Sequence, residues 1–234
     1  MPSLPQDPYS LKALPFLSSR RLFFWVVPNR FWRLYCHFAQ KPFSRCLDSK
    51  SCNHFILERG AKLPDTSVTT NQRALLLKAV AETESLGTPI AEVGCFNGVT
   101  TRALASQTTR EIYAIDPYAN PKNSEAAYAK FCEATGTMPH VRHLRQSSGD
   151  AARTLAGQRL SLVFIDAVHD YLNTWFDFKV WSELVQDGGF MAFHDVDDWR
   201  GTNVACQKIL NHQKNFSPWG YCPNLVVFRK VKSA

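Results

Sequence analysis

Short apolar runs alternate with helical segments from about residue 70 to the end of the chain, and this alternation limits the fold more than any other feature. Apolar runs at 88–93, 111–115, 141–144, 160–165, 189–193 and 224–231 predict strands. Helical spacing lies between them, at 71–86, 99–106, 124–133, 151–155, 171–185 and 202–212. Strands that alternate with helices indicate βαβ units. We therefore expect an α/β fold with a Rossmann-like, mostly parallel sheet and helices on both faces.

The first 65 residues differ from the rest, so we expect an N-terminal extension over 1–65 and one domain over 66–234. Residues 1–50 contain eight Lys and Arg against two Asp, which is +6 of the net charge of +7. Aromatic residues lie between arginines over residues 20–45. This basic, aromatic segment has three interpretations: a lid or homodimer contact, an anionic membrane surface, or single-stranded nucleic acid. Pro28 interrupts a long helix, and we favour the first interpretation and expect nucleic acid least.

Four positions that follow predicted strands are suited to binding a ligand. Gly94, Asp116, Asp166 and Asp195 each come directly after an apolar run. In open parallel sheets, ligands bind outside the carboxyl ends of the strands, where the strand order reverses. These four positions therefore predict one crevice.

The turn after the first of these strands reads Glu92-Val-Gly-Cys-Phe-Asn-Gly98, and Asp116 follows 18 residues later. Glycines at such a turn permit tight backbone angles and a close approach to a ligand. The spacing lacks the third glycine of a dinucleotide site, and Glu92 would repel a pyrophosphate but receive an ammonium group. Asp116 is placed to accept hydrogen bonds from ribose hydroxyls. The pattern favours S-adenosyl-L-methionine over NAD.

These residues resemble the first two motifs of class I S-adenosylmethionine-dependent methyltransferases. The resemblance implies that Glu92, Gly94 and Gly98 lie at the methionine end of the cofactor, with Cys95 and Phe96 in the same loop, and that Asp116 lies at the ribose. The segment Ser148-Gly-Asp150 resembles the part that frames adenine. From the residues alone, Asp150 is equally suited to cap a helix that begins at Ala151.

Two further segments, Asp166-Ala-Val-His169 and His194-Asp195, resemble methyltransferase family 24, which includes macrocin-type sugar O-methyltransferases. The resemblance covers residues 70–213 and implies methyl transfer to a hydroxyl of a small acceptor, a sugar or glycan. His169 is then the general base, and Asp166 and Asp195 are ligands of Mg²⁺ or another divalent cation, with Asp166 also beside the cofactor. His194 stands where metal-dependent members carry an acid, and it is either a third ligand or a polar residue that contacts the cofactor or lies behind the ligands.

The same residues are compatible with two different functions: a non-catalytic cofactor-binding module of the same fold, or a methyltransferase acting on RNA or protein. Three features favour a cytoplasmic protein: seven cysteines without a C-x-x-C pair, no signal-peptide pattern and no apolar run of about 20 residues. Peripheral membrane contact through residues 20–45 is left open. We expect Asp177, Asp187, Asp197 and Asp198 to be solvated charges.

Overall fold

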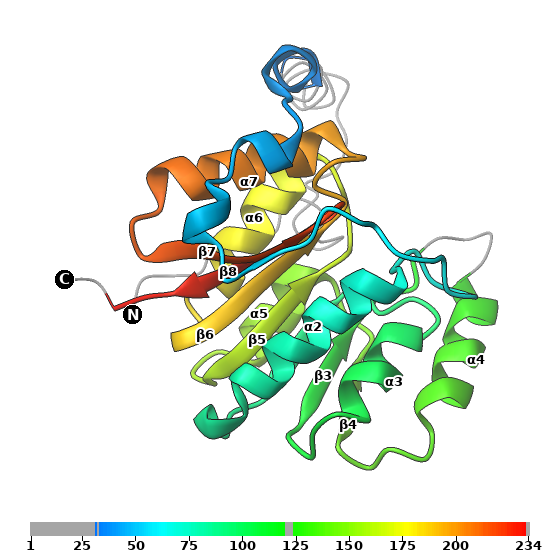
Figure 1. The fold of residues 1–234 in the computed structure, drawn as a ribbon. Helices are drawn as coiled ribbons and strands as arrows, with labels where there is room; N and C mark the ends of the chain where they lie inside the picture. The colour runs from blue at the N-terminus through cyan, green and yellow to red at the C-terminus, as the bar shows by residue number, and fades with distance from the viewer. Residues whose placement is uncertain (1–30, 32, 120–123, 233–234) are drawn as a thin grey trace.

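The six predicted strands, together with two strands that the sequence patterns do not predict, form one eight-stranded sheet in the order β1-β7-β8-β6-β5-β2-β3-β4 (Figure 1). It is seen in a computed structural model that describes residues 31, 33–119 and 124–232. The strands are β1 (His54–Phe55), β2 (Ile90–Val93), β3 (Ile112–Ile115), β4 (Val141–Leu144), β5 (Leu160–Ile165), β6 (Val185–His194), β7 (Phe216–Cys222) and β8 (Leu225–Lys230). All neighbouring strands are parallel except β8, which is antiparallel to both β6 and β7. The expectation of a mostly parallel Rossmann-like sheet is confirmed.

Helices cover both faces of this sheet (Figure 1). They are α2 (Thr70–Glu82), α3 (Val99–Ala105), α4 (Ser124–Thr135), α5 (Ser148–Thr154), α6 (Tyr171–Trp181) and α7 (Arg200–His212). Helices α2 and α3 pack through Leu75, Leu76 and Leu104 on one face, and α6 and α7 pack through Phe178 and Ile209 on the other. Because both faces of β2 and β5 are covered, these strands are fully buried and are mostly apolar, with Glu92 and Ser161 as their polar residues.

The strand order reverses beside β2. The chain passes from β2 to β3 and β4 on one side, and then returns to place β5 on the other side of β2. This reversal opens the sheet at the carboxyl ends of β2 and β5, which is where ligands bind in folds of this kind.

The described part of the N-terminal extension is joined to the domain. Strand β1 pairs with β7, and Phe43 is fully buried in the same core as α6 and α7. The backbone N–H of Phe43 donates to Asp197 Oδ1 at 3.0 Å, and Tyr221 and Asn224 donate to Asp197 Oδ2. The prediction of Asp197 as a solvated charge is wrong, because this carboxylate ties residue 43 to the end of the sheet.

The sequence patterns place most elements within a few residues of their observed bounds. The helix expected over 171–185 ends at Trp181, because Val185 already pairs with Leu160 as the first residue of β6. The patterns do not predict strand β7, since it contains Pro218 and Gly220, which lower strand propensity. None of the helices in the described part of the chain has the length and apolar character needed to cross a membrane. Residues 20–30 of the basic, aromatic segment lie outside the described residues.

Candidate active site

A first cavity of about 510 Å³ lies at the carboxyl ends of β2, β3 and β5. It brings together six of the residues that the sequence predicts for the site: Gly94, Phe96, Asp116, Ser148, Asp166 and His169. Of the four positions expected to form one crevice, Gly94, Asp116 and Asp166 line this cavity and Asp195 does not. Glu92, Cys95, Gly98 and Asp150 do not line this cavity.

Gly94 allows the ends of β2 and β5 to meet. Its φ is +92°, and a Cβ atom at this position would lie 2.0 Å from the carbonyl oxygen of Asp166. No side chain fits in that space, so any other residue would move the two strand ends apart. Gly98 has φ +75° and caps the N-terminus of α3, which completes the turn.

Asp116 holds two turns together at the edge of the first cavity. Its Oδ2 accepts from the backbone N–H of Phe96 at 3.1 Å, and its Oδ1 accepts from the backbone N–H of Tyr118 at 2.8 Å. The Tyr118 hydroxyl donates to the carbonyl oxygen of Phe96 at 2.5 Å and so ties the same two turns from the other side. Each carboxylate oxygen can still accept a further hydrogen bond, because a carboxylate offers about four acceptor positions.

Glu92 lies behind the first cavity rather than in its wall. Its side chain is 1% exposed and accepts a 2.5 Å hydrogen bond from the Thr101 hydroxyl on α3. Burial, and to a smaller extent the charges of Asp166 and Asp116, raise the pKa of Glu92 to about 8 against the opposing hydrogen bond from Thr101. The sequence suggested that Glu92 contacts the ammonium group of a ligand. For that contact the Glu92 carboxylate would have to be ionised, and a ligand in the first cavity would have to reach it.

At the other end of the first cavity, Ser147 caps α5 by accepting from the backbone N–H of Asp150 at 3.2 Å. The sequence suggested Asp150 as the N-cap of this helix, but the N-cap residue is Ser147. Asp150 instead forms an ion pair with Arg153. Ser148 accepts from Trp181 Nε1 at 2.9 Å and donates to Asp177 Oδ1. The Ser148 hydroxyl proton is thus committed within the protein.

Asp177 is a buried residue of α6 that lines the first cavity, and its prediction as a solvated charge is wrong. The burial of Asp177 could have been predicted from the segment Trp175-Phe-Asp-Phe178. An acidic residue within an aromatic helical run is either buried with its neighbours or interrupts the apolar face of the helix. Ser67 also lines the cavity and donates to Asp166 Oδ2 at 3.2 Å. No sequence pattern predicts Ser67 as a site residue, because only the fold of the loop before α2 brings it to the cavity.

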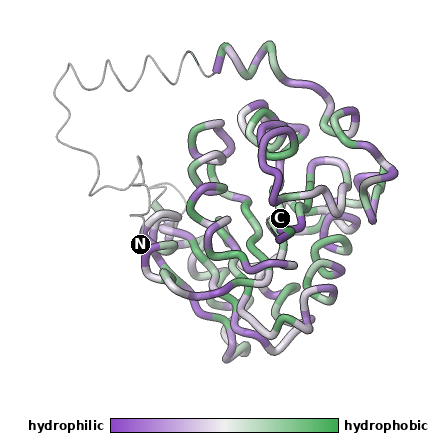
Figure 2. Tube along the Cα trace, turned by 90° about the vertical axis from the view of Figure 1, so that its left-hand side faces the viewer, coloured by the Kyte–Doolittle hydropathy of each residue, from purple (hydrophilic) through white to green (hydrophobic). Residues whose placement is uncertain are grey.

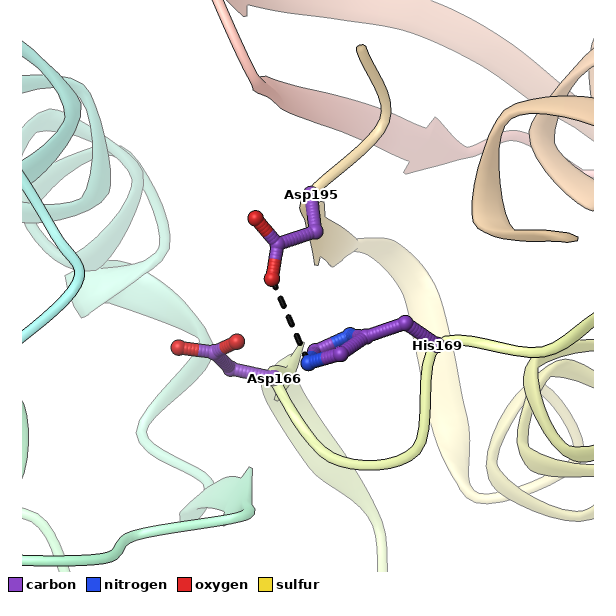
Figure 3. Close-up of side chains that lie close together, drawn as sticks. All are labelled: Asp166, His169 and Asp195. Carbon is purple, nitrogen blue, oxygen red and sulfur yellow. Dashed lines mark ion pairs between the residues drawn. The ribbon is translucent and has the colours of Figure 1, made fainter. Parts of the chain in front are cut away.

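The polar side chains at the ends of β5 and β6 converge. His169 Nε2 lies 3.3 Å from Asp195 Oδ2, and Asp166, His169 and Asp195 each offer one ligand atom within 4.8 Å of the others (Figure 3). Asp195 has φ +62°, so its backbone is held in the left-handed region, and Asn224 Nδ2 donates to its Oδ1 at 2.7 Å. Burial alone would raise the pKa of Asp195, but the charges of His194 and His169 and the hydrogen bond from Asn224 outweigh it and lower that pKa.

His194 lies beneath this group with its side chain fully buried. Its Nε2 is 3.2 Å from Gln72 Oε1, and the Gln72 amide is fixed because Nε2 of Gln72 donates to the carbonyl oxygen of Pro223. His194 Nε2 therefore carries a proton. His194 Nδ1 lies 3.4 Å from both Asp166 Oδ1 and Asp195 Oδ1 but has no hydrogen-bond partner among the described residues. Burial lowers the pKa of His194, yet Asp166 and Asp195 outweigh burial and raise it to about 10.

A second cavity, of about 700 Å³, opens on the other side of His169. Its walls come from α6, from the start of α7 and from the helical residues 33–39, and they include Arg33, Trp199 and Arg200. The Trp199 ring is 52% exposed and lies 5.0 Å from the His169 ring at an angle of 35°. His169 lines both cavities and is the only residue common to their walls in the described part of the chain.

Comparisons with known proteins agree with this fold and site. A family model described as a methyltransferase domain matches residues 91–196, which run from β2 to just after β6. No curated protein matches the chain in sequence.

Solved structures share the fold at low sequence identity. The O-methyltransferase NovP has a TM-score of 0.60 and 13% identity, over 86% of this chain and 99% of that one. An O-methyltransferase from Bacillus cereus in complex with S-adenosylhomocysteine has a TM-score of 0.56 and 18% identity, over 73% and 84%. A TDP-rhamnose 3'-O-methyltransferase of calicheamicin biosynthesis has a TM-score of 0.54 and 16% identity, over 72% and 88%.

The matched domain supports a methyltransferase enzyme, and the shared fold is that of class I S-adenosylmethionine-dependent methyltransferases. Within that class it resembles methyltransferase family 24. Its fold is that of O-methyltransferases, as the sequence motifs predicted.

Proposed function

We propose that this enzyme transfers the methyl group of S-adenosyl-L-methionine to a hydroxyl of a small acceptor, a sugar or glycan, with His169 as the general base. The observation that carries the proposal is the position of His169 between the two cavities. Methyl transfer needs the sulfonium methyl on one side and the acceptor hydroxyl on the other, with a proton acceptor at the junction.

The first cavity is suited to the cofactor. Asp116 at its edge offers acceptor positions to ribose hydroxyls, and the Gly94 turn lets the backbone approach the methionine part closely. At the far end, Asp177 provides a buried carboxylate acceptor for the amino group of adenine, while Ser148 holds Asp177 in place. We assign the side chains of Glu92 and Asp150 to supporting positions, because neither lines the cavity.

Asp195 is placed to assist His169 in removing the proton. When His169 takes the proton of the acceptor hydroxyl, its imidazole becomes a cation, and the Asp195 carboxylate at 3.3 Å stabilises that charge. The Trp199 ring beside His169 limits the positions that the imidazole can take.

The same group of residues fits a divalent cation. Asp166 and Asp195 offer carboxylate oxygens, and the buried Nδ1 of His194 lies 3.4 Å from an oxygen of each carboxylate. Because the pKa of His194 is raised to about 10, its Nδ1 carries a proton when no ion is bound, and an ion held there would displace that proton. A mixed set of oxygen and nitrogen donors favours Mn²⁺ or a similar ion over Mg²⁺. Such an ion would supply Lewis-acid polarisation of the acceptor hydroxyl. Asp166, Asp195 and His194 would hold it, and His169 would remain the proton acceptor.

The second cavity supports a sugar as the acceptor. Trp199 offers an exposed aromatic face at the cavity wall, against which the C–H face of a sugar ring can pack. Arg33 and Arg200 supply hydrogen-bond donors for hydroxyl or phosphate oxygens. The family resemblance and the shared fold of the TDP-rhamnose 3'-O-methyltransferase support the same acceptor class.

Titration of S-adenosylhomocysteine into the EDTA-treated protein, followed by calorimetry with and without Mn²⁺, tests the cofactor half of the proposal. Micromolar affinity supports it, and absence of binding under both conditions would overturn it. Transfer of labelled methyl groups to a panel of free and nucleotide-linked sugars then tests the acceptor. Labelling of RNA or protein in place of every sugar would contradict the proposed acceptor class.

A further inference from the structure

We infer that the helix at the start of the described chain, formed by residue 31 and residues 33–39, docks on an anionic membrane surface. We call it the N-terminal helix. It stands at the edge of the molecule beyond α7 in Figure 1, and at the top of the view in Figure 2. This inference concerns a surface outside both cavities and is independent of the proposed function.

Large apolar side chains gather on the outer face of this helix. Phe31, Leu34, Tyr35 and Phe38 are 61%, 60%, 48% and 78% exposed. Their spacing of three and four residues places them on one face, which we call the apolar stripe. Four exposed large apolar residues within eight positions are unusual, because isolated exposed apolar residues are normal but contiguous ones mark an interaction surface.

The opposite face of the N-terminal helix fixes its orientation on the domain. Cys36 is buried against Tyr171, Val204 and Ala205, and Gln40, just after the helix, accepts a 3.0 Å hydrogen bond from Arg200 Nε. Through Arg33, Cys36 and Gln40 this face also lines the second cavity. The apolar stripe therefore points away from the domain.

Charge complementarity selects an anionic lipid surface as the occupant. Lys41 and Arg45 are exposed just after the helix, and residues 1–50 carry +6 of the net charge of +7. Aromatic side chains with neighbouring arginines are the composition of segments that lie in the lipid interface. A second copy of the chain is disfavoured as the occupant, since a stable dimer interface needs about 20–30 residues from each subunit and the stripe offers four.

The test uses the full chain and vesicles in a sedimentation assay. We expect binding to vesicles of phosphatidylcholine with phosphatidylglycerol, weaker binding to phosphatidylcholine alone, and release as salt concentration rises. Changing Phe31→Ser, Leu34→Ser, Tyr35→Ser and Phe38→Ser together should lower the partition coefficient at least about tenfold. Leu57→Ser is the matched control, because Leu57 is 73% exposed but lies outside the stripe.

Correct folding of the stripe variant is checked by circular dichroism and thermal denaturation, which do not depend on the cofactor. Binding by the stripe variant at the wild-type level would overturn the inference, as would absence of wild-type binding to anionic vesicles. If the wild type does not bind vesicles, two findings would identify a different occupant of the stripe and overturn the inference. The first is a dimer that the wild type forms and the stripe variant does not. The second is an oligonucleotide that binds the wild type but not the stripe variant. A failure of S-adenosylhomocysteine to bind would contradict the proposed function and leave the vesicle result unchanged.

Discussion

His169 Nε2 lies 3.3 Å from Asp195 Oδ2, and the two residues follow neighbouring parallel strands. The contact is short because β5 and β6 end at the same edge of the sheet, with Ile165 opposite Phe193. A pair that forms this way does not depend on a bound ligand. The sheet itself therefore brings together His169, the proposed base, and the carboxylate proposed to stabilise its charged form.

Replacing His169 tests whether this pair serves catalysis. His169→Ala should lower turnover about 10²-fold or more, because it removes the proton acceptor. Its affinity for S-adenosylhomocysteine should change little. The control is His212→Ala, which removes an exposed histidine at the end of α7. Full turnover by His169→Ala would refute the base, and absence of any turnover in the wild type would favour a non-catalytic cofactor-binding module.

Asp116 should contribute strongly to cofactor binding. Asp116→Ala removes hydrogen bonds from a charged acceptor and should weaken S-adenosylhomocysteine binding by about 1.5–3 kcal/mol, measured by calorimetry. The same change also releases the backbone N–H groups of Phe96 and Tyr118. Tyr118→Phe separates the two effects, because it loosens the same turns without touching the carboxylate. Equal losses in both variants would assign the effect to the turns, and unchanged affinity in Asp116→Ala would remove Asp116 from the site.

The sequence predicts the crevice because it depends on strand ends. Gly94, Asp116, Asp166 and Asp195 follow apolar runs, and a parallel sheet brings such positions to one edge regardless of packing detail. Strand β7 escapes prediction, because its Pro218 and Gly220 conflict with local propensity and only pairing with β8 makes it a strand.

The orientation of individual side chains could not be predicted. Glu92 has the residue type and spacing of a ligand contact, yet it points toward Thr101, because alternation along β2 directs it to the α3 side of the strand. The sequence predicts solvated charges at Asp177 and Asp197, since the partners that bury them are distant along the chain. Such contacts are fixed only when α5 packs on α6 and residue 43 packs on the sheet.

Metal removal should decide whether Asp166, Asp195 and His194 hold an ion. We expect methyl transfer to be lost after EDTA treatment and restored by Mn²⁺ more effectively than by Mg²⁺, because the set contains an imidazole nitrogen. Asp166→Asn should raise the Mn²⁺ concentration needed for half-maximal restoration about tenfold or more. The exposed Asp187→Asn is the matched control. Turnover that is indifferent to EDTA would refute the metal and leave His169 and Asp195 as the catalytic pair.

Glu92 should make the ligand-free enzyme less stable as pH rises. Burial raises the pKa of Glu92 in the folded protein to about 8, from the ordinary value of 4.5 that it has when unfolded. Between these values the folded state holds a proton that the unfolded state has released. The free energy of unfolding therefore falls as pH increases, by up to about 1.4 kcal/mol per pH unit from this residue, and levels off above pH 8.

Glu92→Gln removes this titration and keeps a hydrogen-bond acceptor for Thr101. The free energy of unfolding of the variant, measured by urea denaturation from pH 5 to pH 9, should exceed that of the wild type by an amount that grows up to about pH 8. The exposed Glu183→Gln should show no such dependence. Because Glu92 does not line the first cavity, its replacement should weaken S-adenosylhomocysteine binding less than Asp116→Ala does. If the difference in free energy of unfolding between variant and wild type stays constant with pH, Glu92 is already ionised in the folded protein. If Glu92→Gln loses more affinity for S-adenosylhomocysteine than Asp116→Ala does, Glu92 contacts the cofactor directly.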